Sequence, residues 1–220
     1  SQCSEDDWRA QMNKEILREA LFYPGVNVEV YQAHDDNTHQ IKDIESLIER
    51  KVDLLIVAPN EAEAITPVIE KAYDAGIPVI LVDRKINSKK YTAYVGADNY
   101  EIGRKAGEYI ADRLGGKGRV IEITGLRGST PAVERHRGMM EALKAVPGVQ
   151  VVASAEAGWF RQKAGEVMDT LLDAHPQVNL VFAQNDRMAI GAYEKARQKN
   201  RAGQIAFVGV DAVAGGVESV

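Results

Sequence analysis

The sequence of 220 residues contains one cysteine, Cys3, and no apolar run that approaches the roughly 20 residues of a membrane-spanning helix. A single thiol excludes an internal disulfide and any zinc site built on cysteines. The formal net charge is −5 and the lysines and arginines form no block. This argues against a nucleic-acid surface, because such a surface needs a basic face. The sequence shows no signal peptide, so we interpret it as a mature or excised region.

Catalytic and metal-binding motifs are also scarce. The histidines have no i, i+4 spacing and no paired carboxylate motif, so we expect no metal site. No G-x-S-x-G nucleophile elbow occurs. Four aspartates could supply a pair of catalytic carboxylates, but nothing in the sequence singles out two with different environments; they are Asp83, Asp98, Asp186 and Asp211. We therefore do not expect an enzyme, and we expect no cofactor.

Short apolar runs alternate with segments of helical periodicity along the chain. The unit repeats at about 25 to 30 residues, which is typical of βαβ chains and predicts an α/β fold with parallel sheets. A helix capped by Ser4 and Asp7 is expected to run to residue 22. Strands are expected at 26–30, 54–58, 77–82, 94–96, 119–124, 149–155, 179–183 and 205–210, and further helices at 41–48, 62–72, 99–114, 131–146, 161–174 and 188–198.

The rhythm changes once, between residues 84 and 99, where two strands follow each other without a helix. We place the boundary between two lobes there: a first lobe at 1–94, a second lobe at 95–208, and a hinge and return segment at 209–220. The first lobe lacks an opening strand before its first helix, so we expect a chain cut at both ends and a poorly cooperative thermal unfolding.

Polar side chains follow three of the predicted buried strands. Asp83 and Arg84 follow 77–82, a Gln-Asn-Asp triplet follows 180–183, and Asp211 follows 205–210. Ligands of open α/β sheets bind at the carboxyl ends of the strands, so these side chains are candidates for one cleft. Two alternatives are purely structural. Asp83 and Arg84 could form a local ion pair, and Asp186 could cap the helix that it precedes.

Three other features allow more than one interpretation. The loop at 125–130 precedes a helix but matches neither phosphate-binding pattern, so we do not expect a phosphate site. Arg135, one turn into that helix, could point into the cleft. Trp159 lies in a loop, where an indole is either a packing plug or a platform for the C–H face of a sugar. Trp8 lies on the first turn of its helix and could be core.

Several stretches together resemble the type I periplasmic sugar-binding proteins, the ribose-binding-protein group in particular. They are the I-P-V-I-x-x-D-R pattern of 77–84, residues 95–103, the A-x-x-R-x-x-G of 132–138, the A-H-P of 174–176, the A-Q-N-D-x-M-A-x-G-A of 183–192 and the V-G-V-D of 208–211. The resemblance implies two Rossmann-like lobes that close on a monosaccharide, the first of them incomplete in this chain.

Carried over by position, the resemblance gives a set of sugar contacts. Asp83 and Arg84 would contribute from the first lobe, Arg135, Asn185 and Asp211 from the second lobe and hinge, and Trp159 would stack on the sugar. The first helix of the family begins with an Asn and two aromatics that face the ligand. Here Asp7 and Trp8 occupy that region, and acidic residues replace apolar ones, which favours a ketohexose over ribose itself. We expect Asp83→Ala to abolish sugar binding with little change in the ligand-free melting temperature.

The resemblance extends to the sensing regions of hybrid two-component receptors that regulate carbohydrate use. The function implied is a periplasmic domain that binds a ketohexose or pentose and signals to a transmembrane sensor kinase, which the complete protein would carry. The alternatives are the solute-binding protein of an ABC sugar transporter and the effector domain of a lac-repressor-type transcription factor. The expected partners are a monosaccharide and a membrane sensor or permease, without nucleic acid, and a homodimer is compatible with this interpretation.

Overall fold

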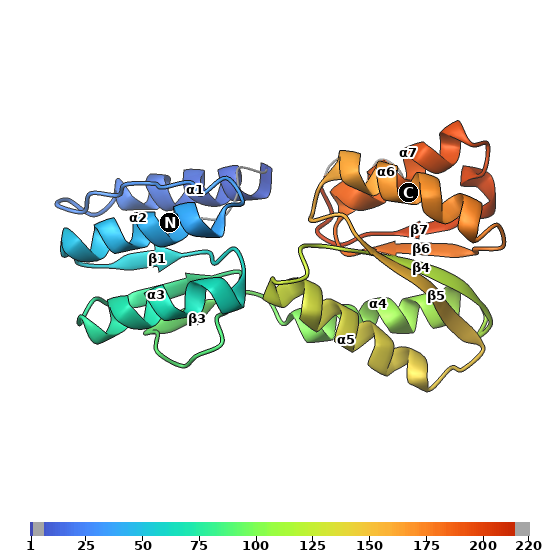
Figure 1. Ribbon diagram of the computed structural model, residues 1–220, viewed down its shortest axis with the longest axis horizontal. Coiled ribbons are helices and arrows are strands. Elements are labelled where there is room, and N and C mark those ends of the chain that lie inside the picture. The colour runs from blue at the N-terminus through green and yellow to red at the C-terminus, as the bar shows by residue number, and fades with distance from the viewer. Residues whose placement is uncertain (2–6, 214–220) are drawn as a thin grey trace. The chain divides into compact units, whose positions relative to one another are not determined.

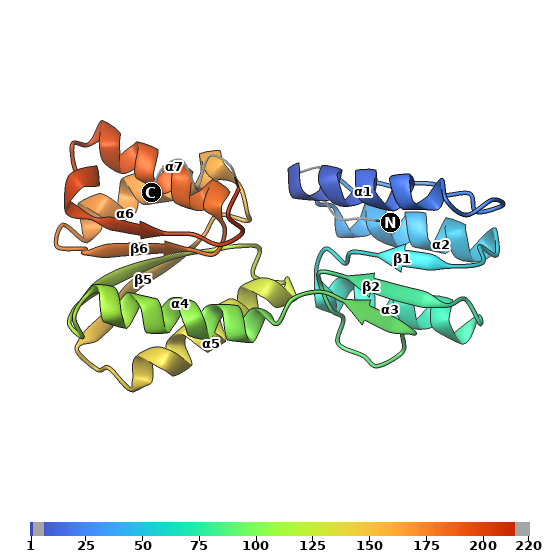
Figure 2. The ribbon, with the colours of Figure 1, turned by 180° about the vertical axis from the view of Figure 1, so that it is seen from behind.

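The chain forms two compact units in a computed structural model that describes residues 1 and 7–213 (Figures 1 and 2). The first unit consists of Ser1–Ala97 with Gly128–Thr130. The second consists of Asp98–Arg127 and the described residues from Pro131 to Val213. Within the described residues, no helix is both long enough and apolar enough to span a membrane.

The first helix, α1, spans Asp7–Ala20. Its predicted cap at Ser4, the cysteine Cys3 and the side chain of Asp7 lie outside the described residues, as does the chain from residue 214 onward. The sequence predicted an apolar stripe along this helix. The only buried side chain described on α1 is instead that of Arg9, and Trp8 is 47% exposed, so the core alternative for this tryptophan is wrong.

The first unit contains a three-stranded parallel sheet of order β1-β2-β3. Its remaining elements are α2 (Asn37–Glu49), β1 (Leu55–Val57), α3 (Ala62–Asp74), β2 (Val79–Val82) and β3 (Ala93–Val95). The helices α2 and α3 pack against each other, and their apolar faces form one core cluster with β1 and β2. The strands β2 and β3 are consecutive and parallel with no helix between them, as the change of rhythm predicted.

The strand predicted at 26–30 is not formed. The valines at its two ends are 57% and 42% exposed, and no residue of this segment pairs with another strand. A strand needs a partner for its backbone groups, and alternation of valines cannot supply one. The backbone of Ser1 instead bonds to β1, where its amino group donates to the Ile56 carbonyl at 2.8 Å and its carbonyl accepts from the Ala58 N–H at 3.0 Å.

The second unit contains a four-stranded parallel sheet of order β5-β4-β6-β7. Its elements are α4 (Asn99–Arg113), β4 (Gly118–Thr124), α5 (Thr130–Lys144), β5 (Val149–Glu156), α6 (Arg161–Ala174), β6 (Leu180–Ala183), α7 (Asp186–Gln198), a 3-10 turn (Ala202–Gln204) and β7 (Ala206–Val208). The helices α4 and α5 cover one face of the sheet and α6 and α7 cover the other (Figures 1 and 2). The predicted α/β class with parallel sheets is confirmed.

Alternate residues of β4 enter different layers of the second unit. Ile121 and Ile123 belong to the core cluster under α6 and α7, and Val120 belongs to the cluster under α4 and α5. By the same alternation Glu122 is directed to the side of α4 and α5, where it is fully buried. A carboxylate in this layer needs polar partners, because a buried charge is costly unless it is hydrogen-bonded.

The helices α4 and α5 cross at backbone contact because both carry glycine at the crossing. A Cβ atom on Gly103 would lie 2.0 Å from the carbonyl oxygen of Arg135, and one on Gly138 would lie 2.0 Å from that of Tyr100. A side chain at either position would force the helices apart. The close crossing that the two glycines allow therefore fixes the position on α5 from which the Arg135 side chain projects.

Candidate functional site

The backbone at Asp83 forms a tight turn directly after β2. The Arg84 N–H donates to the Val82 carbonyl at 2.7 Å, and Asp83 between them has a φ of 64°. This is a γ-turn of the rare hand, which a residue with a Cβ adopts only under strain. Two further bonds hold it: the Asp83 N–H donates to Val95 on β3 at 2.8 Å, and the Tyr94 hydroxyl donates to the Asp83 carbonyl at 3.0 Å.

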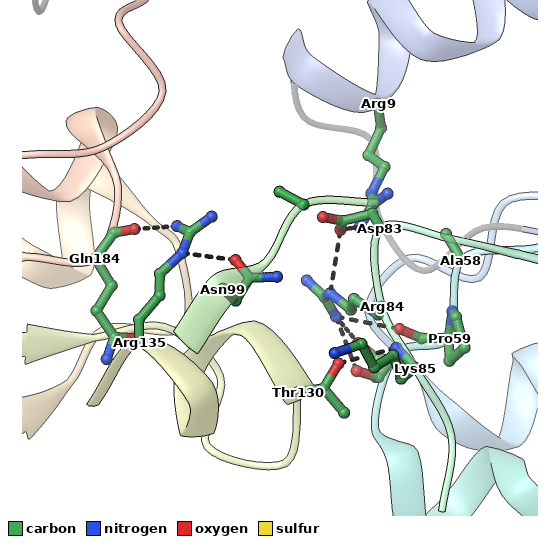
Figure 3. A network of polar contacts seen from close by, with 12 residues as sticks. Arg9, Ala58, Pro59, Asp83, Arg84, Lys85, Asn99, Thr130, Arg135 and Gln184 are labelled. Atoms are coloured by element: carbon green, nitrogen blue, oxygen red, sulfur yellow. Dashed lines mark hydrogen bonds and ion pairs between the residues drawn. The ribbon is translucent and has the colours of Figure 1, made fainter. Parts of the chain in front are cut away.

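Three charged side chains of the first unit meet at this turn (Figure 3). Arg9 of α1 donates from Nη2 to Oδ2 of Asp83 at 2.5 Å, and the Nε of Arg84 lies 3.9 Å from the same oxygen. The side chains of Arg9, Asp83 and Arg84 are 3%, 23% and 6% exposed. Arg84 also donates from Nη1 to the Asn60 carbonyl at 2.8 Å, which anchors it to the loop after β1. The carboxylate is thus held between two buried guanidinium groups.

The aromatic candidate of the first unit adjoins this group. The guanidinium carbon of Arg9 lies 4.9 Å from the centroid of the Trp8 ring, within cation–π distance. Since Trp8 is half exposed, its ring remains accessible to a ligand. The side chain of Asp7 is outside the described residues, and both predicted contacts stay predictions.

A second polar group lies in the second unit around Arg135, which is 7% exposed (Figure 3). Its Nε donates to Oδ1 of Asn99 at 2.9 Å, and its Nη1 donates to the backbone carbonyl of Gln184. Its Nη2 lies 4.0 Å from Oδ1 of Asp211, and its guanidinium carbon lies 5.7 Å from the centroid of the Trp159 ring. The structure therefore brings three predicted contacts together at one guanidinium, from α5, the loop before α6 and the segment after β7.

The fourth predicted contact of this unit, Asn185, caps α7. Its Oδ1 accepts from the Met188 N–H at 2.9 Å, and its Nδ2 donates to the Trp159 carbonyl at 3.4 Å. The assignment of Asp186 as the cap is therefore wrong by one residue. Asp186 is the first residue of the helix, and its Oδ2 accepts from the Val213 N–H at 2.8 Å. Burial raises the pKa of Asp186 above its ordinary value, and hydrogen bonds from the backbone of the 212–213 segment oppose this shift.

Three of the predicted contacts have a strained backbone conformation. Eight described residues other than glycine have a positive φ, and Asp83, Trp159 and Asp211 are among them, with φ of 64°, 78° and 106°. Residues in this region cost free energy, and such residues cluster where a ligand is held. The Trp159 ring lies against Gly125, where a Cβ would come within 2.1 Å of it, and it packs on the core under α6 and α7. Its packing role is therefore real, and a stacking role stays a prediction.

The sequence did not point to Arg9, Asn99 or Gln184 as members of these groups. An arginine in the first turn of a helix is usually solvated, and the pairing of Arg9 with Asp83 spans 74 positions. The sequence does give a weak signal for Asn99 and Gln184. Asn99 directly follows a helix N-cap and Gln184 directly follows the end of a strand, and both amides are buried. Arg127 and Arg137 are exposed. Within the described part of the chain, no group of three or more histidine, cysteine or carboxylate side chains could hold a metal ion.

The chemistry of both groups is the same. Each combines a buried guanidinium, which only donates, with a carboxylate, which only accepts. A sugar hydroxyl both donates and accepts, so two vicinal hydroxyls match such a pair. Hydrogen bonds with one charged partner are about twice as strong as neutral ones, so these groups suit a neutral polyol.

The comparisons with known proteins are consistent across sequence and structure. A family model described as periplasmic binding protein domain matches residues 2–220. The ribose import binding protein of Bacillus subtilis is 35% identical over 187 residues, or 85% of this chain and 60% of that protein. The D-ribose/D-allose-binding protein of Pseudomonas aeruginosa is 34% identical over 213 residues, or 94% of this chain and 65% of that protein. The chain thus spans less than two thirds of these relatives.

One solved structure has a higher identity. It is the fructose-binding periplasmic domain of a hybrid two-component system, which is 54% identical to this chain with a TM-score of 0.95. The match covers 96% of this chain and 71% of that one. A galactofuranose-binding protein is 31% identical with a TM-score of 0.85, covering 90% of this chain and 70% of that one.

Proposed function

Because the chain belongs to the periplasmic binding protein family, we propose that it is a periplasmic domain that binds a monosaccharide. The observation that carries this proposal is the repeated guanidinium–carboxylate group: Arg9 and Arg84 with Asp83 in the first unit, and Arg135 with Asp211 in the second. In each group the carboxylate residue, Asp83 or Asp211, has a positive φ, and a buried guanidinium lies beside it. Rigid placement lowers the entropy lost on binding, so it favours a small polar ligand.

The sugar that we propose is a ketohexose, with D-fructose as the first candidate. The fructose-binding domain shares 54% identity with this chain, against 34–35% for the two ribose-binding relatives. A pentose is the second candidate, because the two relatives described above are named as ribose-binding proteins.

We propose further that the sugar takes hydrogen bonds from both groups at once, so that it favours a closed arrangement of the two lobes. A ligand that binds one state better shifts the equilibrium toward that state by its difference in affinity. In the intact protein, a transmembrane sensor kinase would respond to the closed form. The alternative is a sugar permease that recognises the closed form, which the similarity to import binding proteins supports.

The test of sugar binding is thermal unfolding of the intact protein with a panel of pentoses and hexoses. A sugar at 100 times its dissociation constant should add about 2.7 kcal/mol to the free energy of unfolding, which raises the melting temperature. The result expected is a shift with D-fructose that exceeds the shift with D-ribose. If no monosaccharide in the panel shifts the transition, sugar binding is refuted. Autophosphorylation that responds to the sugar would favour the sensor over the carrier.

A further inference from the structure

A buried carboxylate lies beneath the Arg135 group in the second unit. Glu122 on β4 is fully buried, and both of its oxygens are engaged. Its Oε1 accepts from Nε2 of Gln184 at 3.0 Å. Its Oε2 accepts from the Ser154 hydroxyl at 2.9 Å and lies 2.7 Å from Nδ1 of His136. Oε1 therefore contacts the residue that follows β6, and Oε2 contacts residues of β5 and α5.

Gln184 joins this carboxylate to the candidate sugar site. Its Nε2 donates to Glu122 and also to the Ala132 carbonyl at 3.1 Å, and its Oε1 accepts from the Gly125 N–H at 3.0 Å. Its backbone carbonyl accepts from Nη1 of Arg135 (Figure 3). All of the polar atoms of this side chain are therefore bonded, in a residue that is fully buried. A network that is satisfied in this way holds its members in one geometry.

We propose that Glu122 and Gln184 are positioning residues for the sugar site: Glu122 fixes the amide of Gln184, and Gln184 fixes the carbonyl that aims Arg135. Neither residue contacts the sugar. This inference rests on the proposed function, since it concerns the same site. Arg135 has a second anchor at Asn99, so loss of the Gln184 contact should misplace the guanidinium without releasing it. A displacement of this kind weakens binding while the fold is kept.

The chain offers a matched control because Oε1 and Oε2 of Glu122 have separate partners. Ser154 is directly opposite Glu122 in the pairing of β4 and β5, and its hydroxyl bonds only on the Oε2 side. Ser154→Ala removes a bond from the same carboxylate but leaves the contact with Gln184. If Glu122 only stabilises the fold, each variant should lose sugar affinity in proportion to its loss of stability. If Glu122 positions the site, only a variant that disturbs the Oε1 contact with Gln184 should lose sugar affinity.

The experiment is calorimetric titration of D-fructose, D-ribose and D-galactose into the intact protein, with thermal unfolding of each variant. We expect Glu122→Ala to weaken binding at least tenfold and Ser154→Ala to weaken it less than twofold. Glu122→Gln keeps an acceptor for Gln184 and should recover most of the affinity. Glu122→Asp withdraws the carboxylate by one methylene, so it should weaken binding even if Glu122→Ala does not fold.

The outcomes separate the inference from the function on which it rests. If the wild type binds a sugar and both Glu122→Asp and Glu122→Ala bind it with unchanged affinity, the positioning role is overturned. The same holds if Ser154→Ala and Glu122→Asp lose affinity in proportion to their loss of stability. If the wild type binds no sugar in the panel, the proposed function falls and the inference falls with it.

Discussion

Replacement of Asp83 by Asn isolates the charge of the first group. Asn has the same shape as Asp, so the substitution adds no strain to the turn with its φ of 64°. Its side-chain oxygen can still accept from Arg9, but the bond is no longer between two charges. The variant therefore removes the electrostatic part of the interaction with Arg9 and Arg84 and leaves the geometry in place.

The magnitude follows from the exposure of the partners. Loss of one partner of a fully buried ion pair costs about 3–5 kcal/mol, and a single hydrogen bond to a charged group contributes about 1.5–3 kcal/mol. The Arg9 side chain is 3% exposed, but Asp83 is 23% exposed and its contact with Arg84 is long, at 3.9 Å. We therefore expect Asp83→Asn to lower the free energy of unfolding by about 2 kcal/mol, below the range for a fully buried pair and within the range for a hydrogen bond to a charged group. Sugar affinity should fall at least tenfold, which corresponds to about 1.4 kcal/mol.

Urea unfolding followed by circular dichroism measures the first quantity, and calorimetric titration with D-fructose measures the second. Asp74→Asn is the control for stability, because Asp74 pairs with Lys90 at 2.8 Å on the surface of the same unit, where the side chains are 58% and 45% exposed. A pair of this kind contributes about 0–1 kcal/mol. An equal loss for Asp83→Asn and Asp74→Asn would refute the buried pair. The pair also revises the sequence-based expectation that Asp83→Ala leaves the ligand-free protein unchanged, since Ala would leave Arg9 buried without its carboxylate.

Three further predictions concern the second unit. Gly103→Ala should lower both stability and sugar affinity, because its Cβ would lie 2.0 Å from the Arg135 carbonyl, whereas Gly203→Ala meets no atom within 4 Å and should change neither in calorimetry or thermal unfolding. Asp186 has a raised pKa, so its neutral form favours folding and this contribution is lost as the pH rises through the folded pKa. Asp186→Asn should therefore be more stable than the wild type at pH 7 in urea unfolding, with a difference that shrinks as the pH falls and vanishes only below the unfolded pKa of about 3.9, and a constant difference would contradict this. Trp159→Phe should weaken binding of D-fructose about fivefold, from loss of about 1 kcal/mol of cation–π and stacking contact, and unchanged affinity would assign the indole to packing alone.

The alternation of strands and helices was predictable because it depends on local patterns. Short apolar runs bounded by Gly and Pro became β1, β2, β4 and β6, and the helical stripes became α2 to α7 with ends that differ by a few residues. The strand at 26–30 was predicted wrongly, since alternation reports a preference for extended backbone and not the presence of a partner. The cap of α7 was misplaced by one residue because Asn and Asp are equally good caps.

The candidate site was predictable in part for a similar reason. Asp83, Arg84, Asn185 and Asp211 follow strands, and this position alone made them candidates. Arg9 could not be found in this way, because its burial results from a contact with a residue 74 positions away. The role of Gln184 likewise depends on partners from β4 and α5 that only the fold brings together.

The central claim is that one sugar is held by the charged groups of both units. Calorimetric titration of D-fructose into the intact protein, and into its Asp83→Asn and Arg135→Gln variants, tests this claim most directly. The account predicts saturable binding by the wild type with a stoichiometry of one, and at least tenfold weaker binding by each variant. Wild-type affinity in either variant, or no heat of binding in the wild type, would contradict it.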